Sequence, residues 1–505
     1  MPATAIQTAA QHTFAVSDFH LSDAQPLDPR RPLWKRFKGR NLFIDDSFAR
    51  CLAHMRELAA GARSIELILN GDMFDFDSLT TIPHSPPFPV SWLERRRGLD
   101  AEQDKSTFKM SVILADHPVF VAALRRFLED GHSVAFVIGN HDMELHWPAV
   151  QAEIRRALAL SAEADGRLRF CEWFTLSGTD TLVEHGNQYD SYCVAANPVH
   201  PQIQWRARER VRLPFGNIAG KLMLNGMGLF NPHVESSFIK SLPEYFMFFW
   251  RYVVRTQPLL AWSWFWTAMA TLVITLREGI LPAVLDPFNL DERVEGVAQR
   301  AHASPKLVRA LSSLRVQPVH FHPIRVAREL WLDRAVLLAI VFFGTFQLFS
   351  FLNVFVSLSI WWWLAFFVLV LPPFIFYARS VNSDVNNYER GLHRHVPEAA
   401  RLAGVKRVVM GHTHKEKHTE IEGIELLNPG TWSPAFHDVE CTRPFGRKCF
   451  VWIRPDATTG GRVAELREWR DPGSNVLPQD AAAQPRPSLL ADSLKSITGK
   501  FKKVG

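Results

Sequence analysis

The residues with the clearest chemistry in this sequence are five short blocks of Asp, Asn and His. Carboxylate, amide and imidazole groups are the side chains with which proteins bind divalent metal ions. One such block alone is weak, because Gly-Asp is a common turn and a lone His is more often structural. Five blocks that each follow an apolar run predict a metal centre. The blocks are Asp18-x-His20, Gly71-Asp72-x-x-Asp75, Gly139-Asn140-His141-Asp142, His185-Gly186 and Gly411-His412-x-His414.

The elements that must position these blocks are strands. Apolar runs predict strands at 13–19, 64–69, 133–138, 180–184 and 406–410, and each run ends at one block. Further short strands are predicted at 168–176, 418–427, 448–454 and 462–469. Helical spacing of apolar residues separates several of the strands, which indicates an α/β fold. In such sheets the ligand site lies at the carboxyl ends of the strands.

In this order, the five blocks resemble the calcineurin-like metallophosphoesterases, over about residues 1–190 and 395–435. The resemblance implies a four-layer α/β/β/α metallophosphoesterase sandwich with two divalent metal ions in its cleft. It also implies hydrolysis of a phosphoester bond by metal-activated water. By this resemblance, the ligands of one ion are Asp18, His20 and His414, those of the second are Asn140, His185 and His412, and Asp72 bridges both.

The residue types suit this chemistry. A carboxylate such as Asp72 can bridge two ions through its two oxygens, and the neutral amide of Asn140 limits the negative charge of the site. Imidazole ligands favour transition metals, so we expect manganese, with iron or zinc as alternatives. The resemblance makes His141 a general acid, with Asp75 holding its tautomer and raising its pKa. The alternative for His141 is a structural partner of Asp75 or Asp142.

Other polar residues near the blocks carry weaker predictions. The turn Asn428-Pro429-Gly430-Thr431 also resembles a family turn near the metals, with an ordinary tight turn as the alternative. Asp23 and Asp77 are expected to support the site or to lie on the surface. His320-x-His322 and His393-x-His395 follow no apolar strand, which disfavours them as metal pairs.

Residues 335–377 contain no charged side chain over 43 positions. Because a helix needs about 20 apolar residues to cross a bilayer, this stretch predicts a membrane hairpin with a turn near Asn353. The alternative is a pair of very apolar core helices. A second stretch, 256–276, has 21 residues without charge and includes three Trp.

The number of membrane crossings is constrained, because predicted ligands lie on both sides of these stretches and must reach one site. The chain must therefore cross an even number of times between them. A hairpin at 335–377 and a span at 256–276 would make three crossings. We therefore expect 256–276 to lie in the membrane interface or to enter and return. The alternative is a further, weaker span at 278–290 or 242–254.

Basic residues flank the hairpin on both sides, which by the positive-inside rule places its two ends in the cytoplasm. They are Arg325, Arg328, Arg334 and Arg379. A second group of arginines occupies every second position and is a candidate substrate-binding row, because guanidinium groups suit phosphate. It consists of Arg206, Arg208, Arg210 and Arg212. The alternative is a basic face against anionic lipid headgroups.

The composition of the chain limits the class of protein and the kinds of site that it can form. The chain has 505 residues, 47% of them hydrophobic, and a formal net charge of +6, which is typical of a globular protein and permits an anionic partner. None of the five cysteines forms a C-x-x-C pair, which disfavours a disulfide framework or a Cys-based zinc site. No secretory signal is visible at the N-terminus. The predicted parts are a first core part (1–195), a helical membrane-associated insertion (196–392), a second core part (393–470) and a disordered tail (471–505).

These observations predict a membrane-attached bimetallic phosphoesterase at the inner, cytoplasmic membrane, with its catalytic domain facing the cytoplasm. Its expected partners are membrane lipids and a phosphoester substrate presented at the membrane surface, with no nucleic acid. The oligomeric state is left open. The block V-S-D-F-H-L-S-D at 16–23 also resembles the UDP-2,3-diacylglucosamine pyrophosphatases, which implies a lipid-linked diphosphate as an alternative substrate. Those enzymes typically have Arg in place of His141 and lack so large an insertion.

The alternative from a different functional class is a catalytically silent membrane scaffold. Scaffolds with a dead phosphoesterase fold usually lose ligands, whereas all seven predicted ligands and His141 are present here. A soluble phosphoprotein phosphatase is disfavoured by the apolar hairpin.

Overall fold

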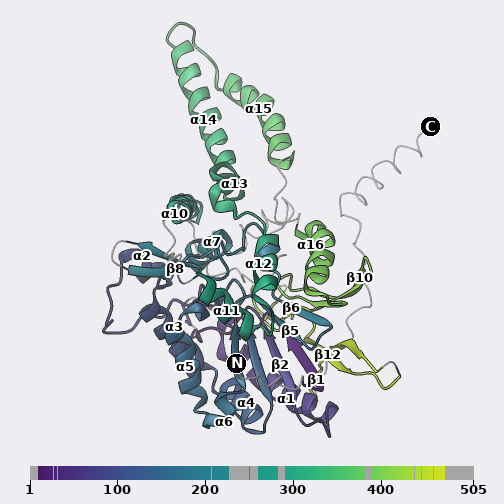
Figure 1. The fold of residues 1–505 in the computed structure, drawn as a ribbon. Coiled ribbons are helices and arrows are strands. Elements are labelled where there is room, and N and C mark those ends of the chain that lie inside the picture. The colour runs from purple at the N-terminus through teal and green to yellow at the C-terminus, as the bar shows by residue number, and fades with distance from the viewer. Residues whose placement is uncertain are drawn as a thin grey trace, which may run out of the picture. The chain divides into compact units, whose positions relative to one another are not determined.

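The structure, a computed structural model, describes residues 10–472 except 27, 31, 206–207, 227–249, 251–259, 282–289, 381–387, 437, 445 and 459. Nearly all of the predicted tail at 471–505 lies outside these residues, as does most of the alternative span at 242–254. The described chain has the mixed α/β class predicted from the sequence, with two large β-sheets and many helices (Figure 1).

The larger sheet has six strands, of which the central ones carry the first three predicted ligand blocks. Its order is β13 (Arg462–Glu468), β12 (Cys449–Pro455), β1 (His12–Val16), β2 (Ile65–Asn70), β3 (Ser133–Val137) and β4 (Leu168–Cys171). Strands β1 to β4 are parallel to one another, and β12 and β13 add an antiparallel edge.

The second sheet has five strands in the order β10 (Glu416–Ile421), β11 (Ile424–Pro429), β9 (Arg407–Val409), β6 (Thr181–Glu184) and β5 (Phe174–Ser177). Strands β11, β9 and β6 are parallel, with antiparallel neighbours at both edges. Two predicted strands were wrong in extent. The predicted strand 168–176 is divided between β4 and β5, which lie in different sheets, and 418–427 is a hairpin of two strands.

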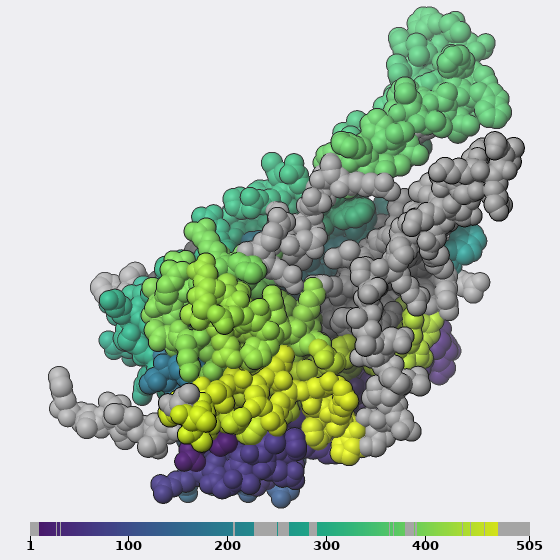
Figure 2. All heavy atoms as spheres, turned by 90° about the vertical axis from the view of Figure 1, so that its right-hand side faces the viewer, coloured from purple at the N-terminus to yellow at the C-terminus, as the bar shows by residue number. Residues whose placement is uncertain are grey.

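The two sheets pack face to face because their side chains alternate between two apolar environments. In β2, Ile68 lies in a buried cluster with Val183 and Val409 of the other sheet, whereas Leu67 and Leu69 face helices. The helices that pack on the larger sheet are α1 (Asp45–Leu58), α3 (Gln103–Asp116), α4 (Pro118–Glu129) and α5 (Pro148–Leu158). Those that pack on the smaller sheet are α11 (Leu290–Arg300), α12 (Pro305–Leu314) and α16 (Tyr388–Ala403). Figure 2 shows α16 adjoining the C-terminal strands on one face of the molecule.

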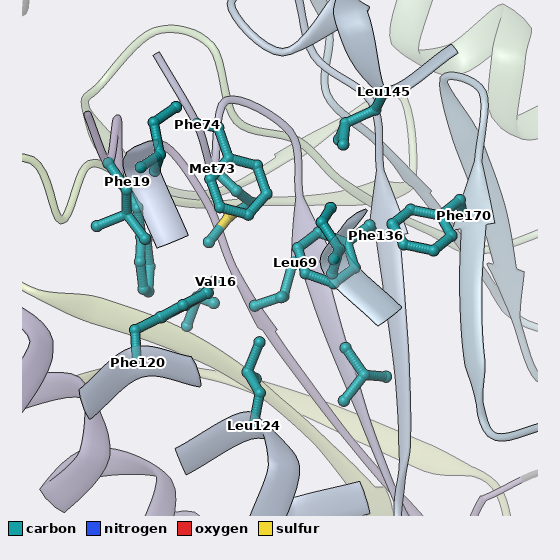
Figure 3. Close-up of a cluster of buried hydrophobic side chains, with 14 of the residues drawn as sticks. Val16, Phe19, Leu69, Met73, Phe74, Phe120, Leu124, Phe136, Leu145 and Phe170 are labelled. Carbon is teal, nitrogen blue, oxygen red and sulfur yellow. The ribbon is translucent and has the colours of Figure 1, made fainter. Parts of the chain in front are cut away.

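A row of apolar side chains fixes the register of the larger sheet at the level where its ligand loops begin (Figure 3). Val16 pairs with Leu69, Leu69 with Phe136, and Phe136 with Phe170, so the four residues lie side by side on adjacent strands. The rings of Phe136 and Phe170 are stacked, with centroids 5.3 Å apart. Phe120 of α4 belongs to the same buried cluster. The carboxyl ends of β1, β2 and β3 therefore lie side by side at one end of the strands.

The segment predicted as a helical insertion is not wholly helical. It contains an antiparallel pair formed by β7 (Gln202–Trp205) and β8 (Arg208–Val211). Its described helices of seven residues or more, besides α11, α12 and the first residues of α16, are α7 (Phe215–Met223), α10 (Leu260–Ile280), α13 (Pro323–Glu329), α14 (Leu332–Leu352) and α15 (Ile360–Ser380). Two further helices, α2 (Trp92–Arg97) and α6 (Ala162–Asp165), lie before this segment. The alternate spacing of the arginines is the period of a strand, and it was the available signal for β8.

Two helices of the described chain are long and apolar enough to span a membrane, namely Leu332–Leu352 and Ile360–Ala378. Almost none of their most apolar stretch is buried, which disfavours the alternative of a core helix pair. The chain turns between them at Asn353, whose Oδ1 accepts a hydrogen bond from the Leu358 N–H at 2.8 Å. Helices α3 and α4 together also pass the length and composition test, but they are bent by 90° and pack in the core.

Candidate metal centre

The predicted ligands lie in loops that follow the carboxyl ends of parallel strands from both sheets. Asp18, Asp72 and Asn140 follow β1, β2 and β3 of the larger sheet, and His185 and His412 follow β6 and β9 of the smaller one. Since the two sheets pack together, these loops converge at one edge of the sheet pair. Convergence of side chains from five strands is what the sequence predicted.

The first group of side chains consists of Asp18, His20 and His414, whose ligand atoms all lie within 4.8 Å of one another. The Nε2 atom of His414 is 3.1 Å from Nε2 of His20 and 3.2 Å from Oδ1 of Asp18. Asp18 and His20 are buried, and His414 is partly exposed. Two imidazole nitrogens and one carboxylate oxygen thus surround a common point, as the ligands of a metal ion do.

The second group consists of Asp72, His185 and His412, whose ligand atoms also lie within 4.8 Å of one another. Nδ1 of His185 lies 3.0 Å from the carbonyl oxygen of Asn70, to which it can donate only as the protonated nitrogen of the ring. That leaves Nε2 of His185, 3.1 Å from Oδ2 of Asp72, with its lone pair for a metal ion.

Asn140, the fourth predicted ligand of this region, is buried with an unsatisfied acceptor. Its Oδ1 has no hydrogen-bond partner among the described residues. A buried carbonyl oxygen without a partner costs roughly 1–3 kcal/mol, so such atoms persist where something else engages them. The adjacent N–H of His141 donates to Oδ1 of Asp72 at 2.7 Å, which ties the Asn140 loop to the predicted bridging carboxylate. The orphaned oxygen fits a ligand to a cation.

The backbone at the predicted ligands is strained. Five of the eleven non-glycine residues with positive φ in the described part of the chain are predicted ligands. They are Asp18 (57°), His20 (51°), Asp72 (53°), His412 (68°) and His414 (57°). Each left-handed residue costs on the order of 1 kcal/mol, and such strain concentrates at functional sites.

Two glycines let the ligand loops approach each other closely. A Cβ atom on Gly139 would overlap Asp72, and one on Gly411 would overlap Ser17 and lie within 2.7 Å of Oδ2 of Asp18. Both glycines stand directly before predicted ligands, so their role is to admit the neighbouring loop.

The electrostatics of the centre couple its acids to its imidazoles. Burial alone would raise the pKa of Asp72, but the nearby imidazoles of His185, His141 and His20 hold that pKa well below its ordinary value. Burial would lower the pKa of His185, but the charges of Asp72 and Asp18 raise it to about 9. The anionic carboxylates therefore attract positive charge, and a divalent cation would meet the same demand.

His141 lies beside the first group, with its ring 4.9 Å from that of His20. Its Nδ1 is 3.6 Å from Oδ1 of Asp75 and 3.3 Å from Oδ2 of Asp77. Burial opposes protonation of this ring, but Asp72, Asp75 and Asp77 raise its pKa well above the ordinary value. Asp75 therefore contacts His141 as expected, and Asp77 joins it.

Asp142 acts as a brace between loops. Its two carboxylate oxygens accept hydrogen bonds from the N–H groups of Gly139, at 2.6 Å, and Met73, at 2.8 Å. Burial and the charge of Asp72 raise the pKa of Asp142 to about 7. This carboxyl thus connects the loop of Asp72 to the loop of Asn140.

The turn at 428–431 braces the other side of the centre. Asn428 donates from Nδ2 to the carbonyl oxygen of Gly411 at 2.8 Å and to Oγ1 of Thr413 at 3.0 Å. Thr431 donates from Oγ1 to the carbonyl oxygen of Asp18 at 2.8 Å. The turn therefore holds both strained ligand loops in place.

Two residues at the centre were missed by the sequence reasoning. Oδ2 of Asp190 lies 3.1 Å from Nε2 of His412, which orients that ring and leaves Nδ1 as its other nitrogen for a metal ion. Asn217 of α7 donates from Nδ2 to the carbonyl oxygen of Asn140 at 2.8 Å and also hydrogen-bonds Asp77. Asp190 follows the His185 block by only five positions, which was a weak signal, whereas nothing in the sequence around Asn217 indicated its contact.

Two members of the arginine row, Arg210 and Arg212, contact the C-terminal end of α10 or the residue that follows it. Arg206 is outside the described residues, and Arg208 lies 3.4 Å from Glu102 at the surface. Arg210 is buried in an ion pair with Glu278 of α10, and Arg212 donates to the carbonyl oxygen of Leu281. Arg210 and Arg212 therefore fasten α10 to β8, and their place as phosphate ligands stays a prediction.

The remaining candidates lie apart from the two groups. Asp23 pairs with the buried Lys38. Neither His320-x-His322 nor His393-x-His395 joins a group of three metal-ligating side chains within the described ranges. The ring of His395 instead stacks on Tyr189, with centroids 4.8 Å apart.

Comparison with known proteins adds little. No protein-family model matches the chain, and no curated protein does. Among solved structures, the chain is similar to zinc-complexed wild-type Vps29 from Entamoeba histolytica, with 20% identity over 15% of this chain and 47% of that chain, at a TM-score of 0.11. It is also similar to Vacuolar Protein Sorting 29 from Cryptosporidium parvum, with 24% identity over 15% of this chain and 44% of that one, at a TM-score of 0.11. The matched region spans less than half of each of those chains, and at this TM-score the likeness carries no argument about function.

Proposed function

We propose that this protein is a membrane-attached bimetallic phosphoesterase that hydrolyses a phosphoester presented at the membrane surface. The observation that carries the proposal is that two groups of Asp and His side chains converge on strained loops. One group contains Asp18 and the other contains His412. The N–H of His412 donates to Oδ2 of Asp18 at 3.2 Å, which links the two groups directly. The layered arrangement of helices and two sheets supports the proposed metallophosphoesterase sandwich.

Two divalent cations fit these residues. One would be held by Asp18, His20 and His414, the other by Asn140, His185 and His412, with Asp72 between them. The four imidazoles favour manganese, iron or zinc over magnesium or calcium. When bound, such a pair of ions supplies an activated water and positive charge for the phosphoryl oxygens.

The protein's own residues would handle the leaving group. His141 is 23% exposed at its side chain, so it can meet substrate while Asp75 and Asp77 hold its Nδ1. Those carboxylates favour the protonated ring, which can then donate from Nε2 to the leaving-group oxygen. Asp75 and Asp77 are positioning residues in this scheme.

The membrane part of the proposal rests on α14 and α15, which are long and apolar enough to span. We propose that they form a hairpin with both ends in the cytoplasm, at the inner membrane. A lipid-linked diphosphate is then the alternative class of substrate, because it is presented at the same surface. A catalytically silent scaffold is disfavoured, because it would have no need to retain five strained ligands and an orphaned Asn140 oxygen.

The proposal is tested with detergent-purified protein and Mn²⁺, by comparing bis-p-nitrophenyl phosphate, p-nitrophenyl phosphate and a UDP-linked acyl sugar as substrates. We expect turnover of at least one of them that a chelator abolishes and Mn²⁺ restores. Asp72→Asn should lose both metal and turnover, whereas Asp46→Asn, a change at an exposed carboxyl on α1, should lose neither. Full turnover by Asp72→Asn would overturn the bimetallic assignment. Absence of turnover in a protein that has bound two ions would favour the scaffold.

A further inference from the structure

Helix α10 is held on the soluble body of the protein along one of its faces. Ala268, Thr271 and Thr275 are fully buried, and Ala268 packs in a cluster with Phe215 of α7. Near the end of the helix, Glu278 forms a buried ion pair with Arg210 of β8. A helix fastened in this way to a strand pair and to α7 does not cross a bilayer.

The opposite face of α10 is apolar and exposed. Trp262, Trp266, Val273 and Ile280 are separated by four, seven and seven positions, which places them on one side of an α-helix. Each is more than half exposed. A soluble protein rarely presents two tryptophans in this way without a partner surface.

This face continues onto the base of the apolar hairpin. Helix α10 contacts η9 (Val319–Phe321) and α13, which precede the first predicted span, and it also contacts that span, α14 (Figure 1). Phe321, Ile324 and Trp331 on these elements are also more than half exposed. We call the exposed side chains of Trp262, Trp266, Phe321, Ile324 and Trp331 the collar.

The residue types of the collar suit one environment. Tryptophan is enriched where hydrocarbon meets the polar headgroups of a bilayer, and exposed basic residues beside it attract anionic lipids. Arg325 and Arg328 of α13 are exposed next to Ile324. The collar is apolar and aromatic, has arginines beside it and adjoins a predicted span. These features are typical of a helix that lies in the membrane interface.

We propose that α10 lies in the plane of the membrane interface and that the collar seats the soluble body among the lipid headgroups. The partner is the phospholipid surface itself, and the contact is separate from the spans of α14 and α15. Among the described helices, α14 and α15 are then the two proposed crossings, an even number, because α10 contributes none.

The position of the collar also limits the distance between the candidate metal centre and the lipid. Helix α7 packs on α10 and carries Asn217, which hydrogen-bonds the backbone of Asn140. Two helices, α10 and α7, therefore separate the collar from the Asn140 loop, a thickness of roughly 20 Å. For the proposed phosphoesterase, a lipid-linked substrate whose polar part extends from the headgroup layer along these helices would approach the centre.

The test is photolabelling of the full chain in vesicles of phosphatidylcholine and phosphatidylglycerol that contain a diazirine lipid. One lipid carries the diazirine next to its headgroup and the other at the end of an acyl chain. Labelled positions are read by mass spectrometry of proteolytic peptides. The headgroup probe is expected to label 262–273 several-fold more than the peptide of Trp92, which is 67% exposed on α2 and serves as the matched control. The acyl-end probe is expected to label 336–351 of α14 and to leave 262–273 at the level of Trp92.

Two outcomes would overturn the proposal. Labelling of 262–273 by the acyl-end probe as strongly as α14 would mean that α10 crosses the bilayer, and headgroup labelling no higher than at Trp92 would mean that the collar lies outside the lipid. The double variant Trp262→Ser/Trp266→Ser should lower headgroup labelling of the Phe321–Ile324 peptide, whereas Trp92→Ser should not. Because labelling requires neither metal nor turnover, its failure is distinguishable from failure of the proposed hydrolysis.

Discussion

At the scale of single residues, the candidate centre depends on side chains that the metal-binding blocks do not contain. Asp190 orients His412, and Asn217 and Asp77 meet the Asn140–His141 segment. Hydrogen-bonding partners of this kind fix which ring nitrogen faces an ion, and the loss of one typically lowers metal affinity or activity roughly 10- to 100-fold. In the proposed centre, some Asp and Asn side chains would therefore be metal ligands, whereas others position the ligands and His141.

His141 is predicted to act on the leaving group and not on the metals. His141→Ala should retain both ions and lose most rate on alkyl phosphoesters, whose leaving oxygen needs a proton. Loss on p-nitrophenyl esters should be much smaller, because p-nitrophenolate leaves without protonation. Rates on the two ester classes, with metal content measured on the same samples, check this. Equal losses on both classes would contradict a general-acid role.

Glu184 carries a pH-dependent cost to stability. Burial raises the pKa of Glu184 to about 7, and Gln188 and Tyr189 hydrogen-bond its carboxylate. A carboxyl whose pKa is raised on folding favours the folded state below its unfolded pKa, and this contribution is lost as the pH rises through 7. Glu184→Gln should therefore match the parent near pH 4.5 and exceed its free energy of unfolding by up to about 3 kcal/mol near pH 7.5. Urea denaturation of the chelator-treated proteins measures the difference in free energy of unfolding between variant and parent at both pH values. An equal difference at the two pH values would contradict the prediction.

At the scale of elements, a buried ion pair holds β8 and α10 together. Arg210 of β8 and Glu278 of α10 are both buried and form an ion pair. Without this pair, Glu278 would keep, among the described residues, only a longer ion-pair contact with Arg277, at 3.8 Å. Arg210 would keep only one with Asp100, at 4.0 Å. The collar depends on the pair of Arg210 and Glu278, because α10 can present its tryptophans outward only while its other face stays on β8 and α7.

Arg210→Met is predicted to lower the free energy of unfolding by about 2–3 kcal/mol, because Glu278 would stay buried with only the longer contact to Arg277. The double variant Arg210→Met/Glu278→Met should recover most of this loss. Arg208→Met, at an exposed pair, should cost less than about 1 kcal/mol. Chemical denaturation of the three variants checks the order. A stable Arg210→Met protein with a raised KM would instead favour the phosphate-binding alternative for the arginine row.

The strands that carry ligands were predictable because each apolar run ends at a polar block, as for β2 before Gly71-Asp72. The hairpin of β10 and β11 was not recognised, although Glu422 and Gly423 both adopt positive φ in a tight turn between the strands. The strand pair β7–β8 was not predicted, because arginines at every second position fit both a phosphate-binding row and the period of a strand. The contact of Asn217 with Asn140 joins residues 77 positions apart, and no local pattern encodes such a contact.

At the scale of the whole molecule, each group of the centre combines residues that precede α14 and α15 with a histidine that follows them. If these helices span a membrane as proposed, both ends of the hairpin lie on one side of it, because His185 precedes the helices and His412 follows them. The domain boundaries at 195, 392 and 470 stay predictions.

Reporter fusions test this topology. Reporters inserted within 280–330 and after Gly505 should both report the cytoplasm, and one inserted at 354–358, between α14 and α15, should report the opposite side. A periplasmic C-terminus combined with a cytoplasmic reporter in 280–330 would break the argument from parity.

The central claim is that this chain holds two cations between its sheets, and an anomalous difference map from crystals grown with Mn²⁺ tests it most directly. The account predicts two peaks, one beside Asp18, His20 and His414 and the other beside Asn140, His185 and His412, with Asp72 touching both. A map without peaks at these residues, or with a single peak that Asp72 does not contact, would contradict it.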